Sequence, residues 1–495
     1  MSLEEIKEIR SKKLDKVKKV FGQAYPVKIF RDFRAEEAVN NFLKLSRSRK
    51  PLLMAGRIFN IRSHGGVIFC DFTDGFGGRK EEGAVYLQAY LKKDIVGQEQ
   101  FNLFNELADV GDFVEFKGSL FKTKKREKSI KVSSWKIISK SLRPLPEKWH
   151  GLSDVEERYR KRYLDLMMNK TVSDGFVLRS KIIAEIRNFL NKCDFVEVET
   201  PILQPIAGGA SAEPFKTHHN ALDMNLFLRI APELYLKKLL IGGFEKVYEI
   251  GRNFRNEGID VTHNPEFTML EFYQAYKDAE FGRGFAEELI KNLVKKIFNK
   301  QLLEYEGHKV SFSKKFSVVS FYDVLKRHAL INHPEDAPLE DFVLKARQFG
   351  IDVLKSDSKE KIADNIFKKV CRTKLIQPTF VIDYPIELFP LAKKKEDNSE
   401  LADFFQLFVG GLELAKGYSE LNNPLEQRER FKKQQELRRD GDREANEFDE
   451  DFIEAMEYGM PPACGVGIGI DRLAMFFLNV HNIRDAILFP TLRPK

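Results

Sequence analysis

The residues best suited to chemistry lie in one stretch, KVYEIGRNFRNEGIDVTHNPEFTMLEFYQAY, between Lys246 and Tyr276. Side-chain types alternate with period two at both ends, which predicts two antiparallel strands joined by a long polar loop. One face of this hairpin is apolar. A salt-bridged surface hairpin is the alternative interpretation, but solvated faces usually mix Lys, Thr and Ser. The second face and the loop instead collect groups that bind charged ligands: Asn253, Arg255, Glu257, His263, Phe267, Glu271 and Tyr273.

The strings GRNFRNEG and HNPEFTMLEFYQAY resemble motif 2 of the class II aminoacyl-tRNA synthetases, in the version found in lysyl-tRNA synthetases of the bacterial type. The resemblance implies that Arg255 bridges the amino-acid carboxylate and the α-phosphate of ATP. It further implies that Glu257 reads the adenine amino group and that His263 approaches the terminal phosphates, while Phe267 stacks on adenine. A guanidinium suits the first role because it binds two oxyanions at once, which the point charge of a lysine cannot match.

Two flanking regions resemble the other class II motifs. The strings ERYRKRYLDLMMN and FVLRSKIIAEIRNFLNKCDFVEVETPIL predict a helix and then a strand ending at Pro201. They resemble motif 1, which implies a homodimer, although an amphipathic helix alone is more often core packing. The string GVGIGIDRLAMFFLN predicts a strand that continues into a helix near Asp471. It resembles motif 3, which implies that Arg472 binds the ATP phosphates. Taken alone, glycines in a strand could equally reflect tight packing.

The amino-acid pocket is expected to come from segments on both sides of motif 2. The resemblance implies that Gly209 and Glu233 hold the substrate α-amino group, whereas the residues alone would also fit an ordinary turn and a helix-capping acid. A pocket for lysine needs anions at its far end, because burying an unpaired ammonium is costly. The residues that fit this need are Glu271, Tyr273 and Glu420, with Tyr418 covering the aliphatic stem.

The site is also expected to use Mg²⁺, and two departures from the family pattern affect it. The family places a metal-binding acid at Glu413, although acids on this strand could simply keep a sheet edge soluble. A second metal-binding glutamate of the family is replaced by Gln406, and an asparagine near the substrate carboxylate is replaced by Lys416. Glu413 and ATP could still retain one ion. Lys416 either points inward and compensates for lost metal, or turns to solvent.

Residues from about 51 to 140 contain five short β-rich runs separated by turns, which favours a small closed barrel, and the OB-fold is the usual five-stranded one. A purely structural barrel is the alternative. The strings RSHGGVIFCDF, SLFKTKKREKSIKV and KSLRPLPEKWHGL resemble the anticodon-binding domain of lysyl-tRNA synthetases. By this resemblance Phe69 and Gln88 read anticodon bases of tRNA(Lys) by stacking and hydrogen bonding. Ser134 stands where the family has a glutamate, so we expect looser anticodon discrimination.

Composition sets further bounds. The 495 residues are enough for two or three domains, and 82 Lys and Arg against 74 Asp and Glu give a net charge of +8, which suits a polyanionic partner only weakly. Four scattered cysteines indicate neither a disulfide framework nor a zinc site. No apolar run approaches a membrane span and the first residues are charged, so we expect a cytoplasmic protein without membrane contact.

We therefore predict an α+β fold, with an N-terminal OB barrel and a class II catalytic domain built on an antiparallel sheet. The expected boundaries are a basic helix at 1–25, the barrel at 26–145, a linker at 146–157 and the catalytic domain at 158–495, with a helical insertion at about 281–379. The expected reaction activates L-lysine with ATP and charges tRNA(Lys). A synthetase for aspartate or asparagine and a repurposed paralogue remain the alternatives.

Overall fold

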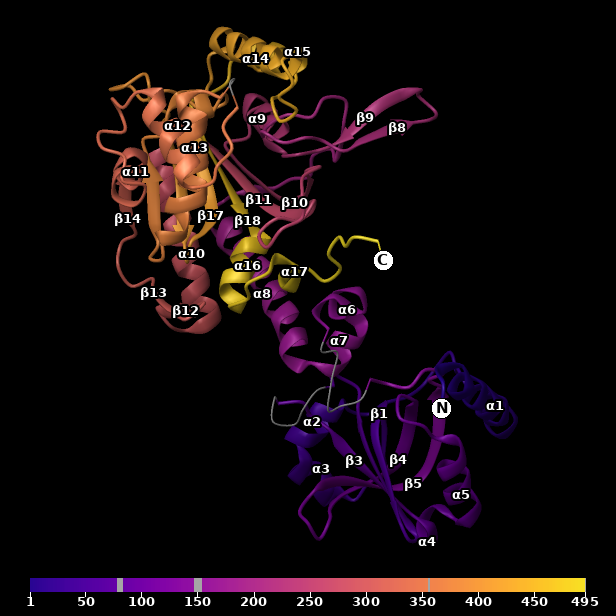
Figure 1. Cartoon of the computed structure of the whole chain (residues 1–495). Coiled ribbons are helices and arrows are strands. Elements are labelled where there is room, and N and C mark those ends of the chain that lie inside the picture. Colours follow the sequence, from indigo (N-terminus) through magenta and orange to yellow (C-terminus); the bar gives the residue numbers. More distant parts are fainter. Residues whose placement is uncertain (78–82, 147–153, 355–356, 495) are drawn as a thin grey trace. The chain divides into compact units, whose positions relative to one another are not determined.

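The computed structural model describes residues 1–77, 83–146, 154–354 and 357–494 (Figure 1). The chain divides into two compact units, the barrel unit, Met1–Gly175, and the sheet unit, Phe176–Lys495. The division falls inside helix α8 (Lys170–Lys192), so α6 (Val155–Arg160) and α7 (Arg162–Met168) belong to the barrel unit. Most of the predicted linker, residues 147–153, lies outside the described residues.

The barrel unit contains the predicted five-stranded closed barrel, with strand order β1-β2-β3-β5-β4. Alternate residues such as Val114, Phe116 and Leu120 face its core, as the period-two pattern requires. Short helices cover the barrel: α2 (Ala35–Asn40), α3 (Phe42–Ser48), α4 (Lys93–Val96) and α5 (Gln98–Leu107). The strands are β1 (Leu52–His64), β2 (Val67–Thr73), β3 (Leu87–Lys92), β4 (Phe113–Lys122) and β5 (Lys128–Ser139).

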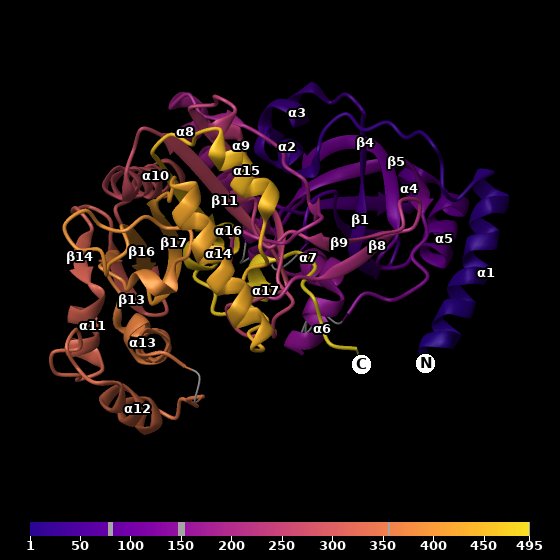
Figure 2. The same ribbon diagram turned by 90° about the horizontal axis from the view of Figure 1, so that it is seen from above.

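The predicted N-terminal helix forms as α1 (Leu3–Phe21), which lies along α5 (Figure 2). Its first turn is closed by a capping box, in which the Ser2 hydroxyl accepts from the Glu5 backbone N–H and the Glu5 carboxylate accepts from that of Ser2. Buried Arg10 donates to the backbone carbonyl oxygens of Ser141, Arg143 and Val110. One face of this basic helix therefore anchors it to the barrel.

The sheet unit is built on an eight-stranded sheet in the order β14-β15-β16-β17-β18-β11-β10-β6, antiparallel except for the parallel pair at each edge. Helices α8, α10 (Ala279–Phe298) and α16 (Ile470–Leu478) pack on one face and share its largest hydrophobic core. The strands are β6 (Val196–Glu197), β10 (Lys246–Phe254), β11 (Glu266–Ala275), β14 (Ser317–Ser320), β15 (Thr379–Ile382), β16 (Phe404–Val409), β17 (Leu412–Ser419) and β18 (Ala463–Gly469).

The predicted central hairpin is present as β10 and β11, paired antiparallel. Tyr248, Leu270 and Phe272 point into the core shared with α8, α10 and α16, as the alternation predicts. Motif 3 also folds as predicted, because β18 runs into α16 within one residue of the expected start. The hairpin and β18 therefore present their opposite face to a ligand.

The span 281–379 is not simply a helical insertion, and this part of the prediction is wrong. α10 belongs to the main core, β14 adds an edge strand to the main sheet, and β12 (Leu302–Tyr305) pairs with β13 (His308–Ser311). Short strands with charged neighbours resemble amphipathic helix in sequence, and tertiary pairing decides between them. The helices of the span pack with β15 and β16 residues in a second core: α11 (Phe321–His328), α12 (Leu339–Gln348), α13 (Lys359–Ile366) and a π-helical turn at Phe367–Cys371.

On the other side of the sheet, α9 (Glu233–Ile241) contacts β11 and α15 (Glu450–Glu457), which lies beside α14 (Pro424–Arg439). A small three-stranded sheet precedes α9, formed by β7 (Leu203–Gln204), β9 (Met224–Leu228) and β8 (Lys216–His219). The last helix is α17 (Ile483–Ala486). Among the described residues, no helix combines the length and the apolar character that crossing a membrane would require.

Candidate active site

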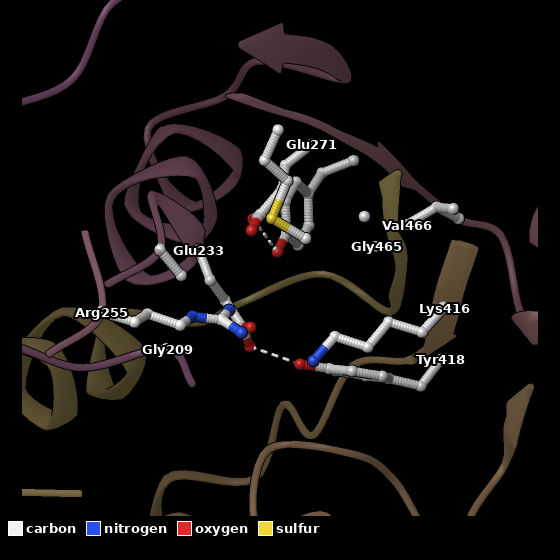
Figure 3. Close-up of a pocket in the computed structure, with 12 residues that line it drawn as sticks. Gly209, Glu233, Arg255, Glu271, Lys416, Tyr418, Gly465 and Val466 are labelled. Carbon is white, nitrogen blue, oxygen red and sulfur yellow. Dashed lines mark hydrogen bonds between the residues drawn. The ribbon is translucent and has the colours of Figure 1, made fainter. Parts of the chain in front are cut away.

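A pocket opens on the sheet face opposite the main core, where β11, β17 and β18 meet α9 (Figure 3). It encloses about 310 Å³ of empty space, part of it open to solvent. Seven residues predicted from the sequence to bind the amino acid meet in this one cavity. The lining is Gly209, Ala231, Glu233, Arg255, Met269, Glu271, Tyr273, Lys416, Tyr418, Gly465, Val466 and Gly467.

Two backbone positions explain how the pocket stays open. Gly209 has a φ of +87°, and a Cβ there would lie 2.9 Å from the Cβ of Glu233, so an L side chain is excluded by both strain and space. Gly465 on β18 lies under Glu420, and a Cβ at this position would sit 2.2 Å from Glu420 Oε1. The glycines of motif 3 are thus part of the pocket floor, a role that sequence reasoning did not assign.

The buried acids Glu233 and Glu271 line the cavity, and Glu420, which was also predicted to bind the amino acid, is buried next to it and is not part of the lining. Tyr418 donates its hydroxyl proton to Glu233 Oε1 at 2.7 Å, and Tyr273 donates to Glu271 Oε2 at 3.0 Å. Burial, reinforced by the charge of Glu233, raises the pKa of Glu271 to about 8. Within the described part of the chain, no hydrogen-bond donor reaches Glu420 Oε1. Buried acceptors of this kind call for a cationic donor from a ligand.

Two cations also line the pocket, Arg255 and Lys416. Arg255 lies with its guanidinium carbon 5.0 Å from the centre of the Phe267 ring, a cation–π distance, and its Nε has no hydrogen-bond partner among the described residues. Lys416 points into the pocket from β17, which settles its orientation in favour of the inward alternative (Figure 3). Burial, and then the nearby charge of Arg255, lowers the pKa of the Lys416 ammonium. These two neighbouring cations can receive an anionic group of a ligand.

A second cluster lies next to the pocket, centred on Arg472 at the start of α16. Its Nη2 donates to His263 Nε2 at 2.9 Å, while Nδ1 of the same ring lies 2.8 Å from an Asp260 carboxylate oxygen, so the neutral ring carries its proton on Nδ1. Arg472 Nη1 lies 3.7 Å from Glu413 Oε2. The arginine, the imidazole and the acid therefore lie together. Glu257, in the loop after β10, does not line the amino-acid pocket.

A β-bulge aims Glu413 at the site. Pairing of β16 with β17 shifts at Leu407, so that Leu414 and Ala415 both pack in the core and Glu413 returns to the face of Lys416. Gln406 stands directly opposite Lys416, and its Oε1 accepts a hydrogen bond from the Tyr384 hydroxyl at 2.6 Å. No group of three or more His, Cys, Asp or Glu side chains that could enclose a metal was found in the described ranges.

The charged groups closest to Glu413 are positive. Burial alone would raise the pKa of Glu413, but the cations Arg472, Lys416, Lys368 and Arg372 lower it overall. Lys368 belongs to the π-helical turn and Arg372 follows it, so the span expected to be a simple insertion contributes charge to the site. Sequence reasoning missed both cations, because nothing in their local pattern points to β17.

The barrel carries a separate polar and aromatic face. Arg62, Phe69, Tyr90 and Lys131 stand opposite one another in successive strands, and the Phe69 and Tyr90 rings lie 5.5 Å apart. Phe69 is half-buried and Arg62 is largely exposed. This row has the composition of a base-stacking surface. Arg62 was missed from sequence, although its place opposite Phe69 follows from pairing of β1 with β2.

Gln88 lies in the neighbouring row and is buried. Its amide nitrogen approaches Asp71 Oδ1 at 3.4 Å, and its carbonyl oxygen accepts from the Ser129 hydroxyl at 3.1 Å. The side chain is therefore engaged within the barrel. Ser134 is exposed opposite Lys117, beyond a bulge in the pairing of β4 with β5.

Comparison with known proteins agrees with both units. Residues 154–493 match the family described as tRNA synthetases class II (D, K and N), and residues 52–138 match the OB-fold nucleic acid binding domain. The chain is 47% identical to the lysine–tRNA ligase of Pelotomaculum thermopropionicum over 495 residues, which covers 100% of this chain and 96% of the relative. It is also 47% identical to the lysine–tRNA ligase of Syntrophomonas wolfei, covering 100% and 98%. A further relative, the lysine–tRNA ligase of Aquifex aeolicus, is 47% identical over 90% of this chain and 74% of its own.

Proposed function

The chain belongs to the class II lysyl-tRNA synthetases, and from this premise we propose that it activates L-lysine with ATP to lysyl-adenylate and transfers the lysine to tRNA(Lys). The observation that carries the choice of amino acid is a pocket lined by the buried acids Glu233 and Glu271 together with Arg255 and Lys416, with buried Glu420 next to it. Lysine has two ammonium groups and one carboxylate, and this arrangement provides a partner for each. Aspartate and asparagine would leave the buried carboxylates of Glu271 and Glu420 unpaired.

The proposed roles follow from position. Glu233 receives the α-ammonium, and Glu271 with Glu420 receives the ε-ammonium, while the Tyr418 ring covers the stem. Arg255 and Lys416 orient the lysine carboxylate, which is itself the nucleophile toward the α-phosphorus, so no side chain need act as a general base. Phe267 stacks on adenine and Glu257 reads its amino group. Arg472 and His263 bind the phosphates, and the two arginines, Arg472 and Arg255, neutralise the charge that develops there.

The proposed cofactor is Mg²⁺. Glu413 is the residue that would hold it, since Mg²⁺ needs only one or two protein carboxylates when substrate phosphates complete its coordination. When bound, the ion would neutralise phosphate charge. Glu413 supplies a single carboxylate for such an ion, because Gln406 offers a neutral amide that is already bonded to Tyr384.

The direct test is ATP/pyrophosphate exchange measured with each of the twenty amino acids. We expect strong exchange with lysine alone, because a neutral or acidic side chain leaves Glu271 and Glu420 without a cation. Strong exchange with aspartate or asparagine, and none with lysine, would refute the proposal. No exchange with any amino acid would favour a repurposed paralogue.

Lysine affinity should depend on pH through Glu271. Its raised pKa of about 8 means that the empty pocket holds a proton below that pH, and an incoming ammonium must displace it. The same raised pKa affects the stability of the free protein. The contribution of Glu271 to folding is fully present below the pKa of a glutamate in the unfolded chain, and it is lost as pH rises through about 8. We expect the Kd for lysine to fall, by up to about tenfold per pH unit, between pH 6 and 8.

Calorimetry in buffers of different ionisation enthalpy measures both the Kd and the protons released. Binding of ATP alone provides the control and should lack this dependence on Glu271. Lysine binding that is flat over the same pH range and releases no proton would contradict the assignment of Glu271 as the ammonium partner.

We propose that the barrel binds the anticodon of tRNA(Lys) through Phe69, with Gln88 supporting the surface. Phe69→Ala should weaken tRNA charging by about 1 to 3 kcal/mol, the range for one base stack, and leave adenylate formation intact. Phe30→Ala is a matched control, because Phe30 is 73% exposed on the same unit and lies outside the aromatic row. Loss of both activities in Phe69→Ala would identify the residue as structural.

We further propose a homodimer through motif 1 and a place in the cytoplasm, where its tRNA substrate is used. Support for the dimer comes from apolar side chains of this region that stand exposed in the single chain. Val177 on α8, Val196 on β6 and Ile202 and Leu203 beside β7 are between 43% and 47% exposed. Exposed apolar surface of this kind marks association sites.

A further inference from the structure

Lys237 is a lysine of the protein itself, fully buried beside the pocket proposed for lysine. It lies on α9 four residues after Glu233, so the two side chains share a helix face. Its Nζ donates to Glu233 Oε1 at 2.6 Å and forms an ion pair with Glu420 Oε2. The same Nζ lies 5.6 Å from the centre of the Tyr418 ring. The ammonium therefore bridges two carboxylates that come from a helix and from the end of a strand.

Each bridged acid pairs one oxygen atom with Lys237, and its other oxygen has no donor among the described residues. Glu233 Oε1 accepts from both Lys237 and Tyr418, and no hydrogen bond from a described residue reaches Glu233 Oε2. Glu420 Oε2 pairs with Lys237, whereas Glu420 Oε1 faces Gly465 and has no donor in the described part of the chain. One oxygen of each acid is thus held by the protein, and the other is left for a ligand.

Lys237 also balances the number of charges in this region. Three acids lie in the pocket or next to it, Glu233, Glu271 and Glu420, whereas lysine has only two ammonium groups. With Lys237 included, three ammonium groups meet three carboxylates when the substrate is bound. Without it, one buried carboxylate would have to take up a proton or remain unpaired, and either change weakens its hold on a cation.

We propose that Lys237 is a positioning and specificity-determining residue of the amino-acid site, which holds one oxygen of Glu233 and one of Glu420 and so leaves the other oxygen of each for the two ammonium groups of the substrate. This inference rests on the proposed function and deepens it. Lys237 does not touch the reacting atoms. It acts through the two acids, so its loss should change lysine recognition and not ATP recognition.

The groups that face this bridge come from three strands as well as from α9. They are Glu271 and Tyr273 on β11, Lys416 and Tyr418 on β17, and Cys464 on β18. Burial raises the pKa of both tyrosines, of the thiol and of Glu420 well above their ordinary values, and the charge of Lys237 opposes that rise at Glu420. Removing Lys237 should therefore raise the pH needed for lysine binding.

The experiment compares Lys237→Met and Lys237→Gln with the wild-type chain in lysine-dependent exchange, from pH 6 to 9. Glutamine can still donate hydrogen bonds but has no charge, so it separates charge from geometry. Lys238→Met is the matched control, because Lys238 is the next residue, is partly exposed and pairs with Asp451 outside the pocket. We expect the KM for lysine to rise about tenfold or more in both Lys237 variants at pH 7.5, with the KM for ATP within about twofold.

The pH at which the KM for lysine levels off should also move upward by about one unit. A KM for lysine that matches the Lys238→Met control, or an equal rise for lysine and ATP, would overturn the proposal. Loss of the thermal unfolding transition in both variants would also overturn it, in favour of a structural role. A wild-type chain without lysine-dependent exchange would instead refute the proposed function on which this inference rests.

Discussion

Replacing Glu271 with glutamine is expected to weaken lysine binding by about 3 kcal/mol, roughly a 100-fold rise in Kd. Glu271 is buried on β11, and its Oε2 accepts from Tyr273. The substitution keeps the size and the hydrogen-bonding capacity of the side chain but removes the charge. The ε-ammonium of lysine would then be buried beside Glu420 alone, with one negative charge fewer to stabilise it.

Isothermal titration of lysine measures this effect without ATP turnover. Glu266→Gln provides a matched control on the same strand, since Glu266 is half-exposed and pairs with Arg252 away from the pocket. The variant Glu271→Gln should also lose the pH dependence of lysine binding, because the titrating group is gone. Wild-type affinity in Glu271→Gln would exclude this residue as the ammonium partner.

Lys416→Asn is expected to reduce the rate of adenylate formation by about 100-fold or more, the effect of removing one preorganised charge from a reacting centre. Lys416 lines the pocket beside Arg255, where the lysine carboxylate and the α-phosphate are proposed to meet. We propose that its charge substitutes for metal that a glutamate at position 406 would bind. Gln406 stands directly opposite Lys416 in the sheet, which is close enough for the two positions to be energetically coupled.

The coupling is measured by a double-mutant cycle across a range of free Mg²⁺. Gln406→Glu with Lys416→Asn should recover part of the lost rate and should need more Mg²⁺ than the wild-type chain. Lys394→Asn controls for the loss of a lysine outside the pocket, since Lys394 pairs with Glu426 on α14. Effects of the two substitutions that simply add would exclude compensation between positions 406 and 416.

Much of the fold was predictable because it depends on local periodicity. Alternation with period two places Tyr248, Leu270 and Phe272 on one side of the central hairpin and Glu271 on the other, whatever the rest of the chain does. The five barrel strands and the step from β18 into α16 follow from the same kind of pattern. The residue types of motifs 2 and 3 then identified Arg255 and Arg472 through a family resemblance.

The bridge made by Lys237 required the tertiary structure. Its spacing from Glu233 is a helix signal that many exposed ion pairs share, and its second partner, Glu420, lies 183 positions further along the chain. No local period links α9 to the end of β17. The direction of Glu413 is similar, because it depends on a bulge in the pairing of β16 with β17.

Burial also differs between side chains whose types suggest the same role. Gln88 and Phe69 both have types that suit base recognition, but pairing of the barrel strands places Gln88 against Asp71 and Ser129, while Phe69 remains half-exposed beside Arg62. The sequence by itself determined which residue types alternate along each strand and which motifs they form. Only the tertiary structure decided which charges share a buried space, because ion pairing between distant segments depends on how the strands and helices pack and not on the order of residues within them.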